Sequence, residues 1–249
     1  YSARLLPAIF GILGVAAVFY LGRRLFSAPA GLVAALITAL APFHIQYSQE
    51  VRPYSLLFLV TVCSYLFLVR LLFRPTRKNA LLYFLFTSLS MYTHYYGISV
   101  FFSQILFLIL YFLFISGSAR RPVLKKLMLA VLLIFLSYLP WIPALIRLVG
   151  LETFWPPRPR PYFFIAFFKN YFGNEPYLTS VFILLIIVYL ISSGKKDRFP
   201  ENKLLLASWI FLVLFIPYFR SFNHAPMLIR RYSIAVLPAI ILMVGRGLF

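Results

Sequence analysis

The sequence predicts an all-α, polytopic integral membrane protein, and two observations lead to that prediction. Of the 249 residues, 63% are hydrophobic and only 12% are charged, against about 25% charged residues in an ordinary soluble domain. The hydrophobic residues also fall in long runs, and about 20 apolar residues in a helix are enough to cross a bilayer. A soluble core of this length could not cover so much apolar surface, so we expect a single membrane domain over residues 1–249.

About nine apolar segments can be recognised, separated by short polar connections. The second and fourth are short for a membrane span, and we expect them to continue through the polar aromatic residues that follow. A further aromatic run at 162–172 is too short to cross and is expected to lie in the membrane interface as an amphipathic helix. The predicted spans cover about residues 5–22, 28–43, 54–73, 80–93, 97–116, 127–146, 177–192, 204–219 and 232–249.

The basic residues predict the orientation of these segments. The chain has 24 lysines and arginines but only 5 acidic residues, a formal net charge of +19. Of the 24, 15 fall in one alternating set of connections and 9 in the other, and the positive-inside rule assigns the first set to the cytoplasm. No polar region is long enough for a nucleic-acid-binding domain. We therefore attribute the charge to topology and to anionic membrane lipids.

This orientation places the rare polar residues at the outer ends of the segments. Glu50, Glu152 and Glu175 fall outside, as do all three histidines, whereas the middles of the predicted spans contain no Asp, Glu, Lys or Arg. Ion-coupled transporters and pumps usually carry ionisable groups at mid-membrane depth. We therefore expect the chemistry of this chain at its outer, non-cytoplasmic mouth.

The densest polar cluster lies between the second and third predicted spans, at residues 44–54. Glu50 could bind a cation or take a proton, and Arg52 could hold a phosphate through a bidentate contact. The alternative is structural: Glu50 and Arg52 form a local ion pair, and the neighbouring Tyr47 and Tyr54 anchor the chain in the membrane interface. Residue spacing does not decide between these interpretations.

Two further clusters at the outer side allow both a functional and a structural interpretation. His94 and Tyr95 could stack on a sugar or contact a phosphate, with the histidine as a donor, proton carrier or metal ligand; the alternative is an aromatic belt. Arg230 and Arg231 stand against the positive-inside rule. They could bind a lipid phosphate, or extend from a helix end to phospholipid headgroups.

Several stretches of the chain match motifs of one known family. They are ARLLPA at 3–8, YLGRRLF at 20–26, ALAPFHIQYSQEVRPY at 39–54, HYYG at 94–97, and RY at 231–232 ahead of LP at 237–238. In these motifs the chain resembles the polyprenyl-phosphate-sugar-dependent membrane glycosyltransferases of the C-type (GT-C) fold. Within that class it is most similar to the protein mannosyltransferases and the lipid A aminoarabinose transferases.

The resemblance implies sugar transfer on the non-cytoplasmic side of a bacterial or archaeal plasma membrane, from a polyprenyl-phosphate-linked donor to an acceptor lipid, glycan or protein. Some relatives use a divalent metal, for which Glu50 and His94 are candidate ligands. The acidic catalytic base of the family precedes the stretch matched here, so we expect it upstream of Tyr1 and expect this chain to be an N-terminally truncated fragment. The implied substrate- and phosphate-binding residues are Glu50, Arg52, Tyr54, His94, Tyr95, Arg230 and Arg231.

Two other functions remain open at the level of the sequence. A transporter or flippase of lipid-linked sugars would move the lipid without forming a glycosidic bond. A non-catalytic membrane partner would keep the same fold without the chemistry.

Overall fold

The structure of the chain is a computed structural model that describes residues 2–114, 121–150, 158–159, 162–193, 197–223 and 226–249. This described part contains helices and no strand, which confirms the all-α prediction. Three short 3-10 segments are η1 (Ser2–Arg4), η3 (Leu139–Trp141) and η4 (Arg230–Ala235). The α-helices are α1 (Leu5–Leu25), α2 (Ala28–Leu40), α3 (Pro42–Ser48), α4 (Tyr54–Phe73), α5 (Arg77–Thr93), α6 (Tyr96–Phe114), α7 (Arg121–Tyr138), α8 (Ile142–Val149), α9 (Phe163–Tyr171), α10 (Pro176–Ile191), α11 (Asn202–Asn223) and α12 (Leu237–Gly247).

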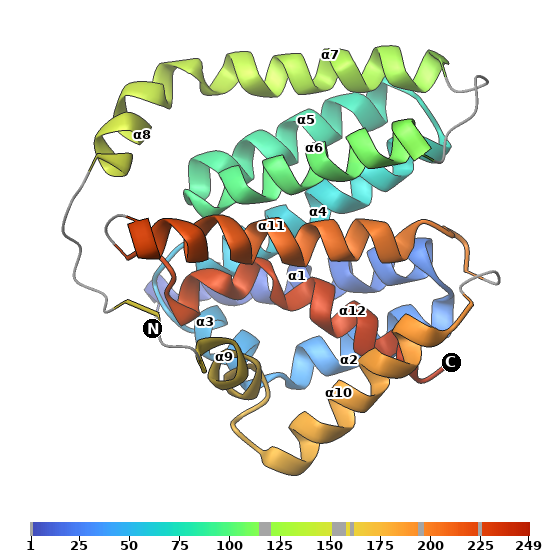
Figure 1. Ribbon diagram of the computed structural model, residues 1–249, viewed down its shortest axis with the longest axis vertical. Helices are drawn as coiled ribbons and strands as arrows, with labels where there is room; N and C mark the ends of the chain where they lie inside the picture. The colour runs from blue at the N-terminus through green and yellow to red at the C-terminus, as the bar shows by residue number, and fades with distance from the viewer. Residues whose placement is uncertain (1, 115–120, 151–157, 160–161, 194–196, 224–225) are drawn as a thin grey trace.

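Most of the long helices lie roughly alongside one another, and the connections between them alternate between two ends of the molecule (Figure 1). One end holds the N-terminus together with α3, α8 and α9, and we call it the α3 end. The other holds the C-terminus, and we call it the opposite end. The connections that the sequence assigns to the outer side meet at the α3 end.

Within the described residues, five helical segments are long and apolar enough to cross a membrane. The count rises to seven if each of two bent helix pairs is one span, so the nine predicted spans are not confirmed. Helix α5 has 17 residues and α12 only 11, which at 1.5 Å per residue is shorter than the bilayer core. The five segments are Ser2–Leu25, Tyr54–Phe73, Tyr96–Phe114, Val123–Leu148 and Asn202–Phe222.

Two predicted spans differ from the helices observed. The span at 28–43 is broken between α2 and α3, which meet at 62°. Proline disfavours helical backbone at the residue before it, and Ala41, ahead of Pro42, is extended with φ −66° and ψ 117°. The span at 232–249 begins instead as the 3-10 segment η4 and continues as the short, mostly buried helix α12.

The aromatic run at 162–172 forms helix α9, as predicted, and it packs against the protein. The Tyr171 ring lies 4.8 Å from the Phe43 ring of α3, and the Tyr171 hydroxyl donates to the carbonyl of Ser233 at 2.7 Å. Phe167 and Tyr171 are buried. Helix α9 therefore holds α3 and η4 together at the α3 end, while its position in the membrane interface stays a prediction.

Helices α4, α5 and α6 are joined by a buried polar network. The side-chain amide of Gln104 donates to Ser64 at 2.7 Å, and the Tyr83 hydroxyl donates to the Gln104 carbonyl oxygen at 3.0 Å. Ser64 and Thr87 share a further hydrogen bond of 2.7 Å. All four side chains are buried. Because these uncharged groups find partners on neighbouring helices, they stabilise helix packing inside the membrane domain.

Helices α1 and α2 approach so closely that only a glycine fits at their contact. A Cβ atom on Gly31 would lie 2.6 Å from the backbone nitrogen of Arg23 and 2.7 Å from the carbonyl oxygen of Phe19. Both are backbone atoms, which cannot move aside as the end of a flexible side chain can. The packing of the first two helices therefore depends on Gly31.

We expect Gly31→Ala to destabilise the protein by about 1–3 kcal/mol, the usual cost of overpacking. Thermal unfolding of the complete gene product in detergent would measure this loss. Gly150→Ala is the matched control, because a Cβ atom there meets its nearest neighbour at 3.4 Å, an ordinary contact distance. Equal losses in the two variants would contradict the close packing of α1 on α2.

Candidate functional site

Segments that are far apart in the sequence meet at the α3 end and form a cavity of about 580 Å³. We call it the Glu50 cavity. It brings together Glu50, Arg52 and Arg231 of the predicted site residues. Arg230 is exposed and does not line it. The lining residues are Arg4, Gln46, Gln49, Glu50, Val51, Arg52 and Arg231.

Arg4 belongs to the site although sequence reasoning did not select it. It ends η1 and precedes α1, which positions it beside the connection between α3 and α4. It is the first basic residue of the set assigned to the outer side and stands in the first family-like motif, ARLLPA. Those two signals could have identified it, but neither indicates which distant arginines it joins.

Three guanidinium groups face one carboxylate in the Glu50 cavity, which gives it an excess of positive charge at neutral pH. The ion pair between Arg52 Nε and Glu50 Oε2 is long, at 4.0 Å, and the two side chains are 52% and 34% exposed. Such exposed pairs contribute little to stability. A hydrogen bond with the Tyr54 hydroxyl raises the pKa of Arg52, so this arginine stays charged. The cavity can hold a phosphate group through its guanidinium groups.

Beside the Glu50 cavity, aromatic rings cluster around His94. The His94 ring centroid lies 4.3 Å from Tyr95, 4.6 Å from Tyr232 and 6.2 Å from Tyr54. The hydroxyl of Tyr96 donates to the carbonyl of Met227 at 3.3 Å, which ties the start of α6 to the segment before η4. The sequence motifs at 54, 94–97 and 231–232 thus meet in one place.

His94 is held as a neutral imidazole. Its Nδ1 accepts a hydrogen bond from the backbone N–H of Tyr96 at 3.2 Å. Burial, together with the positive charge of Arg231, lowers the pKa of His94 to about 4. Burial and the neighbouring rings of Tyr96 and Tyr232 raise the pKa of Tyr95. At neutral pH both side chains are uncharged, so they can position neighbouring groups or stack on a ligand.

His94 and Tyr95 line a second cavity, of about 300 Å³, rather than the Glu50 cavity. This second cavity lies between the end of α5 and the segment of η3 and α8 that contains Trp141 and Leu145. Tyr54 connects the two places, because it contacts His94 and is hydrogen-bonded to Arg52. The predicted site residues are therefore neighbours, although they do not share a single cavity.

The described residues do not fit the divalent metal for which the sequence suggested Glu50 and His94 as ligands. Among the described residues there is no group of three or more His, Cys, Asp or Glu side chains that could hold a metal ion, and Glu50 and His94 line different cavities. His44 is buried against Phe58, with ring centroids 4.7 Å apart. His224 lies outside the described residues.

Comparison with known proteins gives the family. A family model described as dolichyl-phosphate-mannose-protein mannosyltransferase matches residues 1–143. This is more than half of the chain, and it includes helices α1 to α7 and every lining residue of the Glu50 cavity except Arg231. The chain belongs to this mannosyltransferase family. The resemblance drawn from the sequence motifs is thus confirmed. No curated protein matches the chain.

The fold of this member of the mannosyltransferase family is similar to that of ArnT, which has been solved in two states. The crystal structure of ArnT from Cupriavidus metallidurans in the apo state matches with a TM-score of 0.69 and 19% identity, covering 98% of this chain and 45% of ArnT. ArnT bound to undecaprenyl phosphate matches with a TM-score of 0.67 and 18% identity, covering 99% of this chain and 46% of ArnT. The chain thus spans about half the length of these structures, and its integral membrane fold is confirmed.

Proposed function

We propose that the protein containing this chain transfers a sugar from a polyprenyl-phosphate-linked donor to an acceptor lipid, glycan or protein, on the non-cytoplasmic side of a bacterial or archaeal plasma membrane. The observation that carries the proposal is the Glu50 cavity, in which Arg4, Arg52 and Arg231 surround a space large enough for a sugar phosphate. Membership of the mannosyltransferase family supports it. So does the similarity to ArnT, one of whose structures contains undecaprenyl phosphate.

In this reaction the cavity would hold the phosphate of the donor. An acceptor hydroxyl or amine attacks the anomeric carbon, and the bond from that carbon to the phosphate oxygen breaks. The electron pair stays on the oxygen, so polyprenyl phosphate leaves with an additional negative charge. Guanidinium groups placed beforehand around that oxygen lower the barrier as the charge develops. The acceptor proton passes to a carboxylate that we place outside this chain, upstream of Tyr1.

We expect Arg231→Met in the complete gene product to reduce sugar transfer about 100-fold or more, the usual effect of removing one preorganised charge-stabilising donor. Membranes that contain the natural acceptor would be supplied with polyprenyl-phosphate sugars that carry one label on the lipid and another on the sugar. The release of polyprenyl phosphate and the formation of labelled glycoside would then be measured. Arg230→Met is the matched control, because Arg230 is the adjacent arginine but is exposed and outside the cavity.

The assignment predicts near-normal transfer in Arg230→Met and loss in both Arg231→Met and Glu50→Gln, with membrane insertion unchanged. Equal transfer by the Arg230 and Arg231 variants would contradict the cavity as the donor site. If reconstituted vesicles move the labelled lipid across the membrane without forming a glycoside, the protein is a flippase. If they show neither activity, it is a non-catalytic partner.

A further inference from the structure

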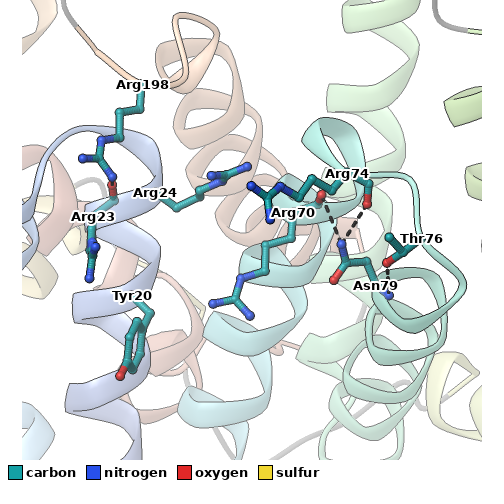
Figure 2. A pocket seen from close by; sticks show the side chains of 8 residues that line it. All are labelled: Tyr20, Arg23, Arg24, Arg70, Arg74, Thr76, Asn79 and Arg198. Carbon is teal, nitrogen blue, oxygen red and sulfur yellow. Dashed lines mark hydrogen bonds between the residues drawn. The ribbon is translucent and has the colours of Figure 1, made fainter.

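A second charged cavity, of about 510 Å³, lies at the opposite end of the molecule (Figure 2). We call it the arginine cavity. Of the residues that the structure describes, five arginines and three uncharged polar side chains line it, and no carboxylate does. The arginines come from the end of α1, from the end of α4 and the turn after it, and from the segment before α11. The five are Arg23, Arg24, Arg70, Arg74 and Arg198.

This cavity is separate from the Glu50 cavity. Arg4 stands immediately before α1 and Arg24 is near the end of that helix, which has 21 residues. At 1.5 Å per residue the two arginines are about 30 Å apart, the thickness of the hydrocarbon core of a bilayer. A single ligand phosphate cannot reach both cavities.

Like charges are concentrated in the arginine cavity. The side chain of Arg24 is within electrostatic reach of Arg70, Arg74 and Arg198. In Figure 2 the guanidinium groups of Arg24 and Arg74 are turned towards each other across the space between their backbone segments. At this end the acidic side chain of Asp197 is already paired with Arg246. The arrangement is therefore repulsive unless an anion enters.

Arg24 also carries a polar atom that lacks a partner. Its Nε is buried and forms no hydrogen bond to any described residue, while the guanidinium carbon lies 4.2 Å from the centre of the Phe73 ring. Buried donors in folded proteins are nearly always hydrogen-bonded, so an exception requires an explanation. A bound anion would supply the missing acceptor and reduce the repulsion.

The walls of the arginine cavity are fixed mostly by bonds that leave the guanidinium groups available. The Asn79 side-chain amide donates to the carbonyl of Arg74 at 2.8 Å, and the Asn79 backbone N–H donates to Thr76 Oγ1 at 3.2 Å. On the other side, the backbone N–H of Phe199 donates to the carbonyl of Leu25 at 2.9 Å. Except for a long contact from Arg198 to a backbone carbonyl, these bonds do not use arginine side chains.

We propose that the arginine cavity is a phosphate-binding site. Several guanidinium groups converge there, and their planar donor pairs match the oxygens of a phosphate group. The ligand is the phosphate of an anionic membrane lipid or of a soluble phosphate compound, and both present the same oxygens to the cavity. If the topology predicted from the basic connections is right, this site faces the cytoplasm. The proposal does not depend on the sugar-transfer activity.

The test is thermal unfolding of the complete gene product, because a ligand that binds only the folded state raises its stability. In one arm, pyrophosphate is titrated into the protein in a neutral detergent, against sodium chloride of equal ionic strength. In the other, the protein is placed in nanodiscs of phosphatidylcholine with or without phosphatidylglycerol. We expect a saturable rise in melting temperature in at least one arm. The first arm indicates a soluble ligand, and a rise confined to the second indicates a lipid.

Three single variants make the test specific. Arg24→Met and Arg74→Met should each weaken the apparent affinity for phosphate at least tenfold, whereas Lys78→Met, which removes an exposed charge outside the cavity, should leave it unchanged. Without phosphate the two arginine variants should be at least as stable as the wild type, since a like charge has been removed. Arg74 is exposed, so its variant remains informative if Arg24→Met fails to fold. No rise in either arm, or an equal rise in the Arg74 and Lys78 variants, would overturn the proposal.

Discussion

Arg246→Met is expected to destabilise the protein by about 3–5 kcal/mol, because it leaves a buried carboxylate without its counter-charge. Arg246 Nε lies 2.5 Å from Asp197 Oδ1, and the two side chains are only 12% and 3% exposed. The second carboxylate oxygen of Asp197 accepts a hydrogen bond from the Asn202 side chain at 3.0 Å. Asn202 in turn accepts one from the Tyr189 hydroxyl at 2.6 Å.

This network joins three parts of the chain at the opposite end of the molecule. Asp197 precedes α11, Tyr189 is on α10 and Arg246 is near the end of α12. The short helix α12 therefore depends on the ion pair to keep its place beside α10. The loss of stability should appear as a lower melting temperature of the complete gene product in detergent.

A double variant separates the ion pair from the individual side chains. Asp197→Asn with Arg246→Met keeps an acceptor for Asn202 and removes both charges, so it should recover at least half of the stability lost in Arg246→Met. Arg52→Met is the control, because its pair with Glu50 is 4.0 Å long and exposed, and its melting temperature should be close to that of the wild type. If the stability lost in the double variant equals the sum of the losses in Asp197→Asn and Arg246→Met, the two charges do not interact.

The sequence was sufficient to predict the helical class and several of the residues that meet at the α3 end, although not Arg4. Long apolar runs impose helices in a bilayer, since backbone groups there must be paired within the segment. The sequence motifs around Glu50, Arg52, His94 and Arg231 identified four side chains that the fold brings to one end. The break before α3 could also have been predicted, because Pro42 biases Ala41 towards an extended backbone.

Other features could not be obtained from the sequence, because they depend on tertiary contacts. The sequence does not show that Gln104 is hydrogen-bonded to Ser64 and Tyr83. The predicted spans contain many serines, threonines and tyrosines, and the sequence does not distinguish those that meet on neighbouring helices from the others. Nor could Glu50 and His94 be separated as metal candidates, because only the fold places them in different cavities. The five arginines of the arginine cavity appeared in the sequence as topology signals, and two of them also in the motif YLGRRLF, but neither signal shows that the five converge.

The stability of the protein is expected to fall as the pH is lowered from about 6.5 to about 4, and His94 should account for a definable part of that loss. Its pKa in the folded protein is lowered to about 4, first by burial and then by the charge of Arg231, whereas an unfolded histidine titrates near 6.5. Between these values the unfolded chain binds a proton that the folded protein does not. The contribution of His94 is therefore fully present above pH 6.5 and decreases below it.

The expected size of this effect is on the order of 3 kcal/mol, from about 2.5 pKa units at 1.36 kcal/mol each. In the folded protein His94 Nδ1 accepts a hydrogen bond from the backbone N–H of Tyr96. Protonation of Nδ1 would remove this acceptor and place two hydrogens opposite each other. Besides Arg231, the groups that face the imidazole are the rings of Tyr54, Tyr95, Tyr96 and Tyr232. None of these supplies a negative charge at this pH that would stabilise an imidazolium.

His94→Gln tests this account, because the glutamine side chain keeps a hydrogen-bond acceptor but cannot titrate. Melting temperatures of the wild type and the variant would be compared at pH 7.5 and pH 4.5 in the same detergent. Other groups that titrate contribute equally to both proteins, so the difference between the two pH-dependent losses isolates His94. We expect a clearly smaller loss in the variant. If the two proteins lose the same stability, His94 is protonated at its ordinary pKa, and the ring cluster does not exclude the charged form.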